Sequence, residues 1–113
     1  MLYNIHELLG KVVTLKTSKG DEIIAKLIGF DDETDTITLE YPKIVVVAGD
    51  TVALAPFALT AKADIIITEG KQFLAVMESL PTTVLDYEDL IAEQKKAEEA
   101  ESVVEEVESD ETA

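Results

Sequence analysis

The sequence IIAKLIGFDDETDTITLEY, residues 23–41, begins with an apolar run and ends in a strict alternation of apolar and polar residues. Between these two parts lies DDETD, in which four of the five residues are acids. Apolar side chains at every second position are typical of a strand with one buried face and one solvated face. The stretch therefore predicts two strands joined by an acidic corner. Gly29, inside the first strand, predicts a bend, a bulge or a close approach of two backbones.

Further strands are predicted on both sides of this pair. VVTLKT, residues 12–17, alternates in the same way, and a turn that contains a glycine follows it. Residues 63–68 and 73–80 predict a last pair of strands around a short polar turn, and Pro81 ends the last strand. Residues 43–61 predict another strand, a hairpin or a long loop, with more apolar surface than one small core can bury.

The two ends of the sequence differ from this central part. Asn4, with Glu7 three residues on, can cap a short N-terminal helix that Gly10 ends. Residues 86–113 contain 12 acids and two lysines, whereas residues 1–85 contain 12 acids and seven lysines. We therefore expect two parts: a domain over residues 1–85 and an acidic tail over residues 86–113 that is partly helical or disordered.

The composition argues against several classes of protein. Without cysteine, the chain has neither a disulfide framework nor a thiolate metal site. Its start lacks the basic end and apolar core of a secretory signal, and no apolar run reaches membrane-spanning length. We therefore expect a soluble protein of a reducing compartment, most simply the cytosol, and no membrane partner.

The sequence contains no constellation of catalytic residues. His6 is the only histidine, and it has no cysteine or second histidine to join as a ligand or a base. There is neither a nucleophile–base pair nor a phosphate-binding loop. The acidic corner lacks the spacing of a known calcium loop, so we interpret it as a solvated turn. The sequence thus predicts a protein that is not an enzyme and that needs no cofactor and no metal.

The order of these elements resembles the Sm-like (LSm) domain, in which a short helix precedes about five strands and the second strand is bent. The resemblance covers residues 4–80, and this variant looks most like the Sm-like proteins of marine bacteriophages (cyanophage type). The residues that match the family's first motif are Val13, Leu15, Gly20, Ile23, Leu27, Phe30, Asp31 or Asp32, Ile37 and Leu39. Those that match the second motif, in IITEGKQFLAV, are Ile66, Ile67, Glu69, Gly70, Phe73 and Val76.

The resemblance implies both a fold and an assembly. The fold is all-β: a small, strongly bent, five-stranded antiparallel barrel of the Sm-like (SH3-like) type, with a short N-terminal helix and an acidic C-terminal helix or disordered tail. In this family the fourth strand of one subunit pairs with the fifth strand of the next, which closes a homo-oligomeric ring. The phage-type resemblance favours a pentamer over a hexamer or heptamer, in the cytoplasm of a bacterium or a phage-infected host. The implied interface residues are Ile65, Ile66, Ile67, Phe73, Leu74 and Val76.

Family members that bind RNA carry an aromatic or apolar residue and an asparagine at the corner, and an arginine or lysine before the glycine of the second motif. Those groups stack on a base, hydrogen-bond its edge and complement phosphate charge. Here the corner holds Thr34 and Asp35, and Glu69 precedes Gly70. Threonine cannot stack, carboxylates repel phosphate, and the chain has no arginine. We therefore expect the usual pore site to be disabled.

Two interpretations of the function follow. The resemblance implies single-stranded RNA as a partner, and the expected site is then a face that bears the N-terminal helix and Lys11, Lys16 or Lys19. The competing interpretation is a phage-type protein-interaction or assembly module without nucleic-acid binding, which uses the acidic tail and VALAPFAL, residues 52–59. That apolar segment is either core and ring interface or an exposed patch for a protein partner.

Overall fold

The structure, a computed structural model, describes the backbone of residues 5–62 and 64–112 and the side chains of residues 5–62 and 64–100. The chain divides into two compact units, Met1–Pro81 and Thr82–Ala113. The described strands all belong to the first unit, and the second unit contains the helix α1 (Pro81–Thr112) except for its first residue. Within the described ranges, no helix has the length and apolar character needed to cross a membrane.

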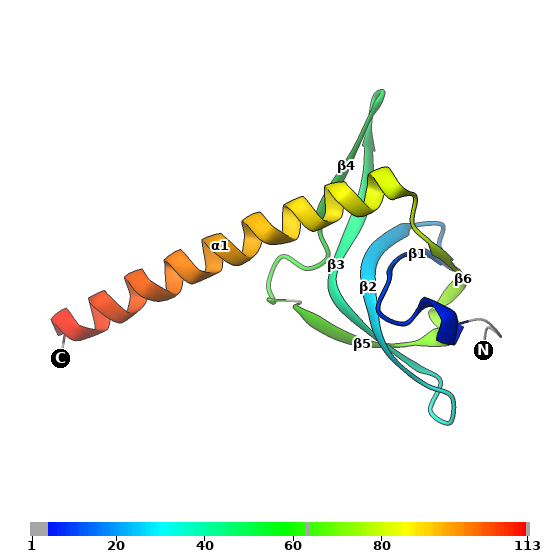
Figure 1. Cartoon of the computed structure of the whole chain (residues 1–113), viewed down its shortest axis with the longest axis horizontal. Helices are drawn as coiled ribbons and strands as arrows, with labels where there is room; N and C mark the ends of the chain where they lie inside the picture. The colour runs from blue at the N-terminus through cyan, green and yellow to red at the C-terminus, as the bar shows by residue number, and fades with distance from the viewer. Residues whose placement is uncertain (1–4, 63, 113) are drawn as a thin grey trace. The chain divides into compact units, whose positions relative to one another are not determined.

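The first unit is a strongly bent antiparallel sheet (Figure 1). Its strands lie in the order β4-β3-β2-β1-β6, and β5 pairs with β3. In chain order, the elements of this unit are η1 (Ile5–Leu8), β1 (Val12–Thr17), β2 (Glu22–Asp31), β3 (Thr36–Ala48), β4 (Thr51–Pro56), β5 (Ile65–Glu69), η2 (Gly70–Gln72) and β6 (Phe73–Glu78).

The long strand β3 organises the sheet because it pairs with three other strands. β2 pairs with one edge of β3 along residues 36–44. β5 pairs with the opposite edge along residues 36–40, and β4 pairs with that same opposite edge along residues 43–48. The acidic corner and the tip of the β3–β4 hairpin therefore lie at opposite ends of β3 (Figure 1).

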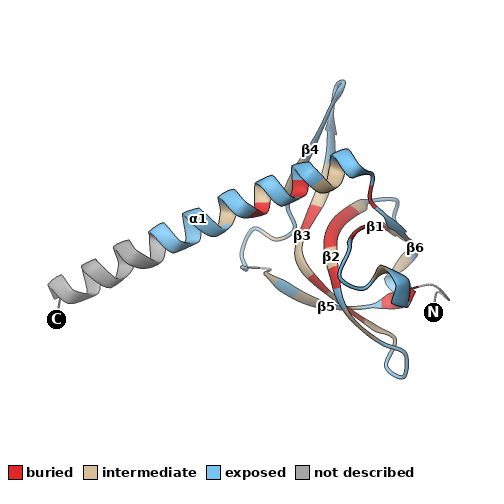
Figure 2. Cartoon of the chain, viewed as in Figure 1, coloured by how far each residue is buried: buried red, intermediate tan, exposed pale blue. Residues whose placement is uncertain are grey.

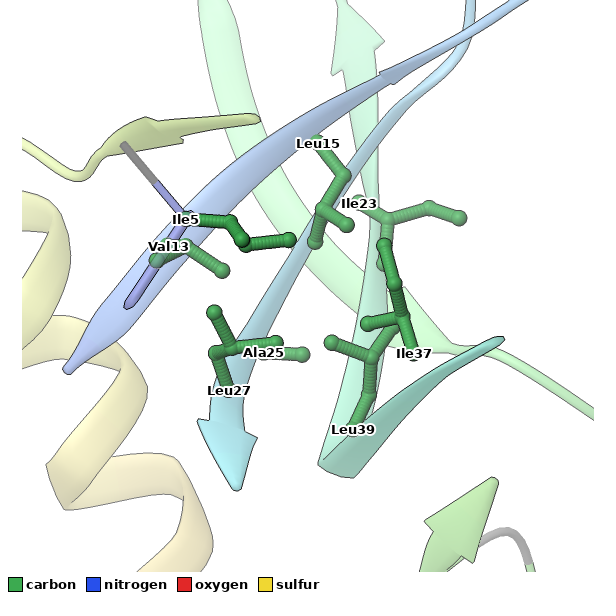
Figure 3. Packing of buried hydrophobic residues seen from close by; sticks show 8 residues of the cluster. All are labelled: Ile5, Val13, Leu15, Ile23, Ala25, Leu27, Ile37 and Leu39. Atoms are coloured by element: carbon green, nitrogen blue, oxygen red, sulfur yellow. The ribbon is translucent and has the colours of Figure 1, made fainter. Parts of the chain in front are cut away.

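The hydrophobic core of the first unit lies where η1, β1, β2 and β3 face one another. Alternate side chains of each strand point inward, because successive side chains of a strand point to opposite faces. Figure 2 shows the buried positions in red along these strands, and Figure 3 shows their side chains converging. The cluster consists of Ile5, Val13, Leu15, Ile23, Ala25, Leu27, Ile37 and Leu39. The alternation in the sequence thus marks the buried face, as expected.

Gly29 combines two of the features expected of a glycine inside a strand. The β2–β3 ladder changes register between Leu27 and Gly29, which is a bulge. A Cβ atom on Gly29 would lie 3.2 Å from the Cβ atom of Thr38 on β3. This distance is shorter than an ordinary van der Waals contact, so a side chain at this position would require Thr38 to shift by a few tenths of an ångström.

The expected fold class is confirmed, with three differences in detail. The N-terminal helix is a single 3-10 turn over Ile5–Leu8, and its expected cap, Asn4, lies outside the described residues. Residues 43–61 contain a hairpin, so β4 is a sixth strand beside the five expected. Pro81 does not end a strand: β6 ends at Glu78, and Pro81 begins α1. Its fixed φ and missing N–H suit the first turn of a helix.

Candidate functional site

The conformation of the acidic corner is set by its own first residue. A carboxylate oxygen of Asp31 (Oδ1) accepts hydrogen bonds from the backbone N–H of Glu33 at 2.9 Å and of Thr34 at 3.4 Å. Asp side chains commonly hold a turn in this way. The hydroxyls of Thr34 and Thr36 are 2.9 Å apart and share a hydrogen bond, which holds these two side chains side by side.

The corner lies beside the second motif, although more than thirty residues separate them in the sequence. The backbone N–H of Gly70 donates to the carbonyl oxygen of Asp35 at 2.8 Å. In the β3–β5 ladder, Thr36 lies opposite Glu69. The structure therefore brings together Thr34, Asp35, Glu69 and Gly70, the four positions at which the family resemblance implies a nucleic-acid site.

The negative charge of the residues at and beside the corner disfavours binding of a phosphate group. Asp31, Asp32 and Glu33 are exposed residues and add three carboxylates to the corner. The carboxylate of Glu69 lies 3.2 Å from the ammonium of Lys71, and both side chains are largely exposed. An exposed ion pair of this kind contributes little stability. Among the described residues, no group of three or more acids or histidines is placed to hold a metal ion.

The three lysines expected on an alternative face do not form one cluster. Lys11 precedes β1, whereas Lys16 and Lys19 lie at its far end and in the turn beyond it. Five residues of strand separate Lys11 from Lys16 by roughly 16 Å. Two of the three ammonium groups also face carboxylates: Lys11 Nζ lies 3.0 Å from Glu78, and Lys16 Nζ lies 3.5 Å from Glu22. Each of these four side chains remains about half exposed.

The six expected interface residues divide into two groups. Ile66, Phe73 and Val76 are partly buried and pack against the core. The side chains of Ile65, Ile67 and Leu74 point outward and are 59%, 72% and 68% exposed. β5 pairs with β3 on one edge and β6 pairs with β1 on one edge; within the described strands, nothing pairs with their other edges. β5 and β6 thus each present an open edge beside exposed apolar side chains, and β4, at the end of the described sheet, presents a third open edge.

Sequence reasoning missed the ion pairs that the lysines form with acids. The pairing of Glu69 with Lys71 had a visible signal, because the two residues are only two positions apart in the sequence. Glu78 is 67 residues from Lys11, so only the β1–β6 register reveals that pair. The spacing of nearby residues in the sequence does not predict the pairing of Lys11 with Glu78.

No protein-family model matches the sequence, and neither does any curated protein sequence. Among solved structures, a heptameric archaeal Sm protein is 18% identical, with 68% of this chain and 97% of that one covered and a TM-score of 0.49. The Pyrococcus abyssii Sm protein in complex with a uridine heptamer is 25% identical, with coverages of 66% and 92% and a TM-score of 0.46. A chain of the NatC complex bound to CoA is 10% identical, with coverages of 77% and 96% and a TM-score of 0.47. These TM-scores are all below 0.5.

Proposed function

We propose that this chain is an Sm-like protein that assembles into a homo-oligomeric ring, in which β5 of one copy pairs with β6 of the next. The observation that carries the proposal is the pair of open edges, with Ile67 exposed on β5 and Leu74 exposed on β6. Open edges with apolar side chains pair indiscriminately unless they are covered. Head-to-tail addition that closes into a ring pairs β5 with β6 at each interface and so covers both of these edges in every copy.

The subunit number that we propose is five, in line with the phage-type resemblance of the sequence. A ring also makes physical sense for this unit, because a domain of about 85 residues buries only about 60–65% of its unfolded surface and gains stability from association. Native mass spectrometry distinguishes five, six or seven copies of the 12.3-kDa chain directly.

For the ligand of the ring we propose single-stranded RNA, bound on the face that bears η1 and Lys11, Lys16 or Lys19 and not at the acidic corner. These lysines are about half exposed or more, and their ion pairs with Glu78 and Glu22 are surface pairs. Surface pairs contribute little stability, so a phosphate group can compete with the carboxylate for each ammonium. Binding of this kind is sensitive to salt because it releases counterions from the RNA.

A second candidate function is a phage-type assembly module that binds protein and no nucleic acid, in the cytoplasm of the host. The pairing of lysines with carboxylates favours it, because it lowers the positive charge available to a phosphate backbone. The net charge of −15 also favours a function without nucleic acid, since it repels a polyanion such as RNA at long range.

Fluorescence anisotropy of labelled single-stranded RNA, titrated with the full chain at two salt concentrations, separates these candidates. Native mass spectrometry of the same sample first establishes that the ring is assembled. Binding that weakens steeply with salt supports the RNA function. An assembled ring that binds no RNA at low salt leaves the protein-assembly function. A chain that stays monomeric at all concentrations overturns the ring itself.

A further inference from the structure

The β3–β4 hairpin carries an unusual surface for so acidic a chain. Residues 44–61 contain a single charged residue, Asp50, whereas 29% of the whole chain is charged. Val47 and Val52 lie directly opposite each other in the ladder and are 68% and 65% exposed. The next pair on the same face, Val45 and Leu54, is also apolar. One face of the hairpin is therefore apolar, and its outer pair, Val47 and Val52, is largely open to solvent while Val45 and Leu54 are half-buried.

The opposite face of the hairpin is apolar as well. Val46 lies opposite Ala53 in the ladder, and both residues are exposed. β2 accompanies β3 only as far as Ile44, so the outer part of the hairpin projects beyond the paired sheet. Figure 2 shows its tip in pale blue, the colour of exposed residues. A protein that stayed monomeric would leave the outer part of this hairpin in water, at a cost in free energy that grows with its exposed apolar area.

The position of β4 indicates which molecule covers the β3–β4 hairpin. β4 and β5 pair with the same edge of β3, one after the other, while β2 occupies the opposite edge. The outer edges of β4 and β5 therefore lie on one flank of the sheet. A copy of the chain that pairs with the outer edge of β5 approaches β4 from the same side.

We infer that the hairpin packs against the same neighbouring copy that pairs with β5, so that each subunit interface extends from the barrel onto Val47, Val52 and Leu54. This inference rests on the proposed ring. Charge supports a second copy as the occupant, since each copy has a net charge of −15 and two copies repel wherever their acidic surfaces meet. Contact through a segment with a single acid avoids most of that repulsion. The side chains in the contact are small or β-branched, which suits close packing of strands.

The absence of cysteine from the chain makes this contact directly measurable. The variant Val52→Cys introduces one thiol on β4, and Ile28→Cys is the matched control on β2, on the far side of β3. Both replace an exposed branched aliphatic residue of a strand. The rate of maleimide labelling is measured for each full-length variant across a dilution series, with native mass spectrometry reporting the assembly state of every sample.

The thiol of Val52→Cys is expected to react at least about tenfold more slowly in the ring than in the dissociated chain, because labelling then requires the interface to open. The thiol of Ile28→Cys is expected to change by less than about twofold, since nothing covers it on assembly. An assembled ring in which the Val52→Cys thiol reacts as fast as in the dissociated chain overturns the inference and leaves the ring standing.

Three other outcomes also decide the question. Slow labelling of Val52→Cys in the dissociated chain overturns the inference, because the chain then covers its own hairpin. Protection that appears only at twice the mass of one ring assigns the contact to a second ring and overturns it too. A chain that is monomeric at every concentration overturns both this inference and the proposed function.

Discussion

The backbone N–H of Gly70 donates a hydrogen bond of 2.8 Å to the carbonyl oxygen of Asp35, and this bond ties the acidic corner to the turn between β5 and β6. Asp35 adopts a positive φ of 52°, a left-handed conformation that aspartate tolerates better than most residues. The corner and the start of η2 are thereby held next to each other. A change of charge at Glu69 therefore changes the electrostatic potential at the corner, although Glu69 lies on a different strand.

Glu69→Lys is expected to strengthen RNA binding. The change replaces a carboxylate with an ammonium beside the acidic corner, which we propose RNA avoids in the unchanged chain. A phosphate contact is thereby created at the corner, so RNA affinity at low salt rises by about tenfold and its salt dependence steepens, since the added contact releases one more counterion. Fluorescence anisotropy with the assembled ring measures both effects. Glu69→Gln is the control: it removes the negative charge without adding a positive one and gives a smaller gain. Identical affinities for all three proteins would show that a positive charge at this position does not bring RNA to the corner.

Ile67→Lys is expected to dissociate the ring. A lysine on the exposed side of β5 disfavours pairing of that edge with another strand, as natural proteins use lysine to protect open edges. Native mass spectrometry across a dilution series measures the loss of the ring species. Ile28→Lys is the control, because it adds the same charge to an exposed isoleucine of β2, away from the open edges. Persistence of the full ring in Ile67→Lys at low concentration would be incompatible with pairing through β5.

Gly29→Ala is expected to lower the free energy of unfolding by about 1–2 kcal/mol, because the new methyl group crowds Thr38 and the strands must shift apart. Chemical denaturation at one fixed protein concentration measures the change, since association also contributes to stability. Thr38→Ala, alone and combined with Gly29→Ala, completes a double-mutant cycle. The cost of Gly29→Ala is expected to be smaller in the Thr38→Ala background. Unchanged or higher stability of Gly29→Ala would refute the close approach.

Leu39→Ala is expected to lower the free energy of unfolding by about 2–5 kcal/mol, because Leu39 is fully buried and its truncation leaves a cavity in the core. Leu59→Ala provides a matched control. Leu59 is 92% exposed, so the same truncation there changes stability by less than about 0.5 kcal/mol. Thermal or chemical denaturation compares the two variants, and similar losses for both would contradict the placement of the core.

Much of the fold was predictable because strand formation depends on local patterns. The alternation in residues 36–41 marks Ile37 and Leu39 as core positions, and both are fully buried. Gly29 signals a bulge or a close approach, and both occur there. The apolar run in residues 43–61 signals surplus apolar surface but leaves its conformation open. Only the ladder between β3 and β4 shows that it is a hairpin, because strand pairing is set by contacts that a local pattern does not contain.

The candidate sites depend on contacts between distant parts of the chain. By itself the sequence determined the acidity of the corner, the lack of arginine and the buried face of each strand, since these follow from residue type and spacing. Tertiary structure alone decided that Gly70 bonds to Asp35, that Lys11 faces Glu78, and that β4 and β5 share one flank of β3. The physical reason is that the register between strands is chosen by the packing of the whole core, and a shift of one residue would turn every side chain to the other face.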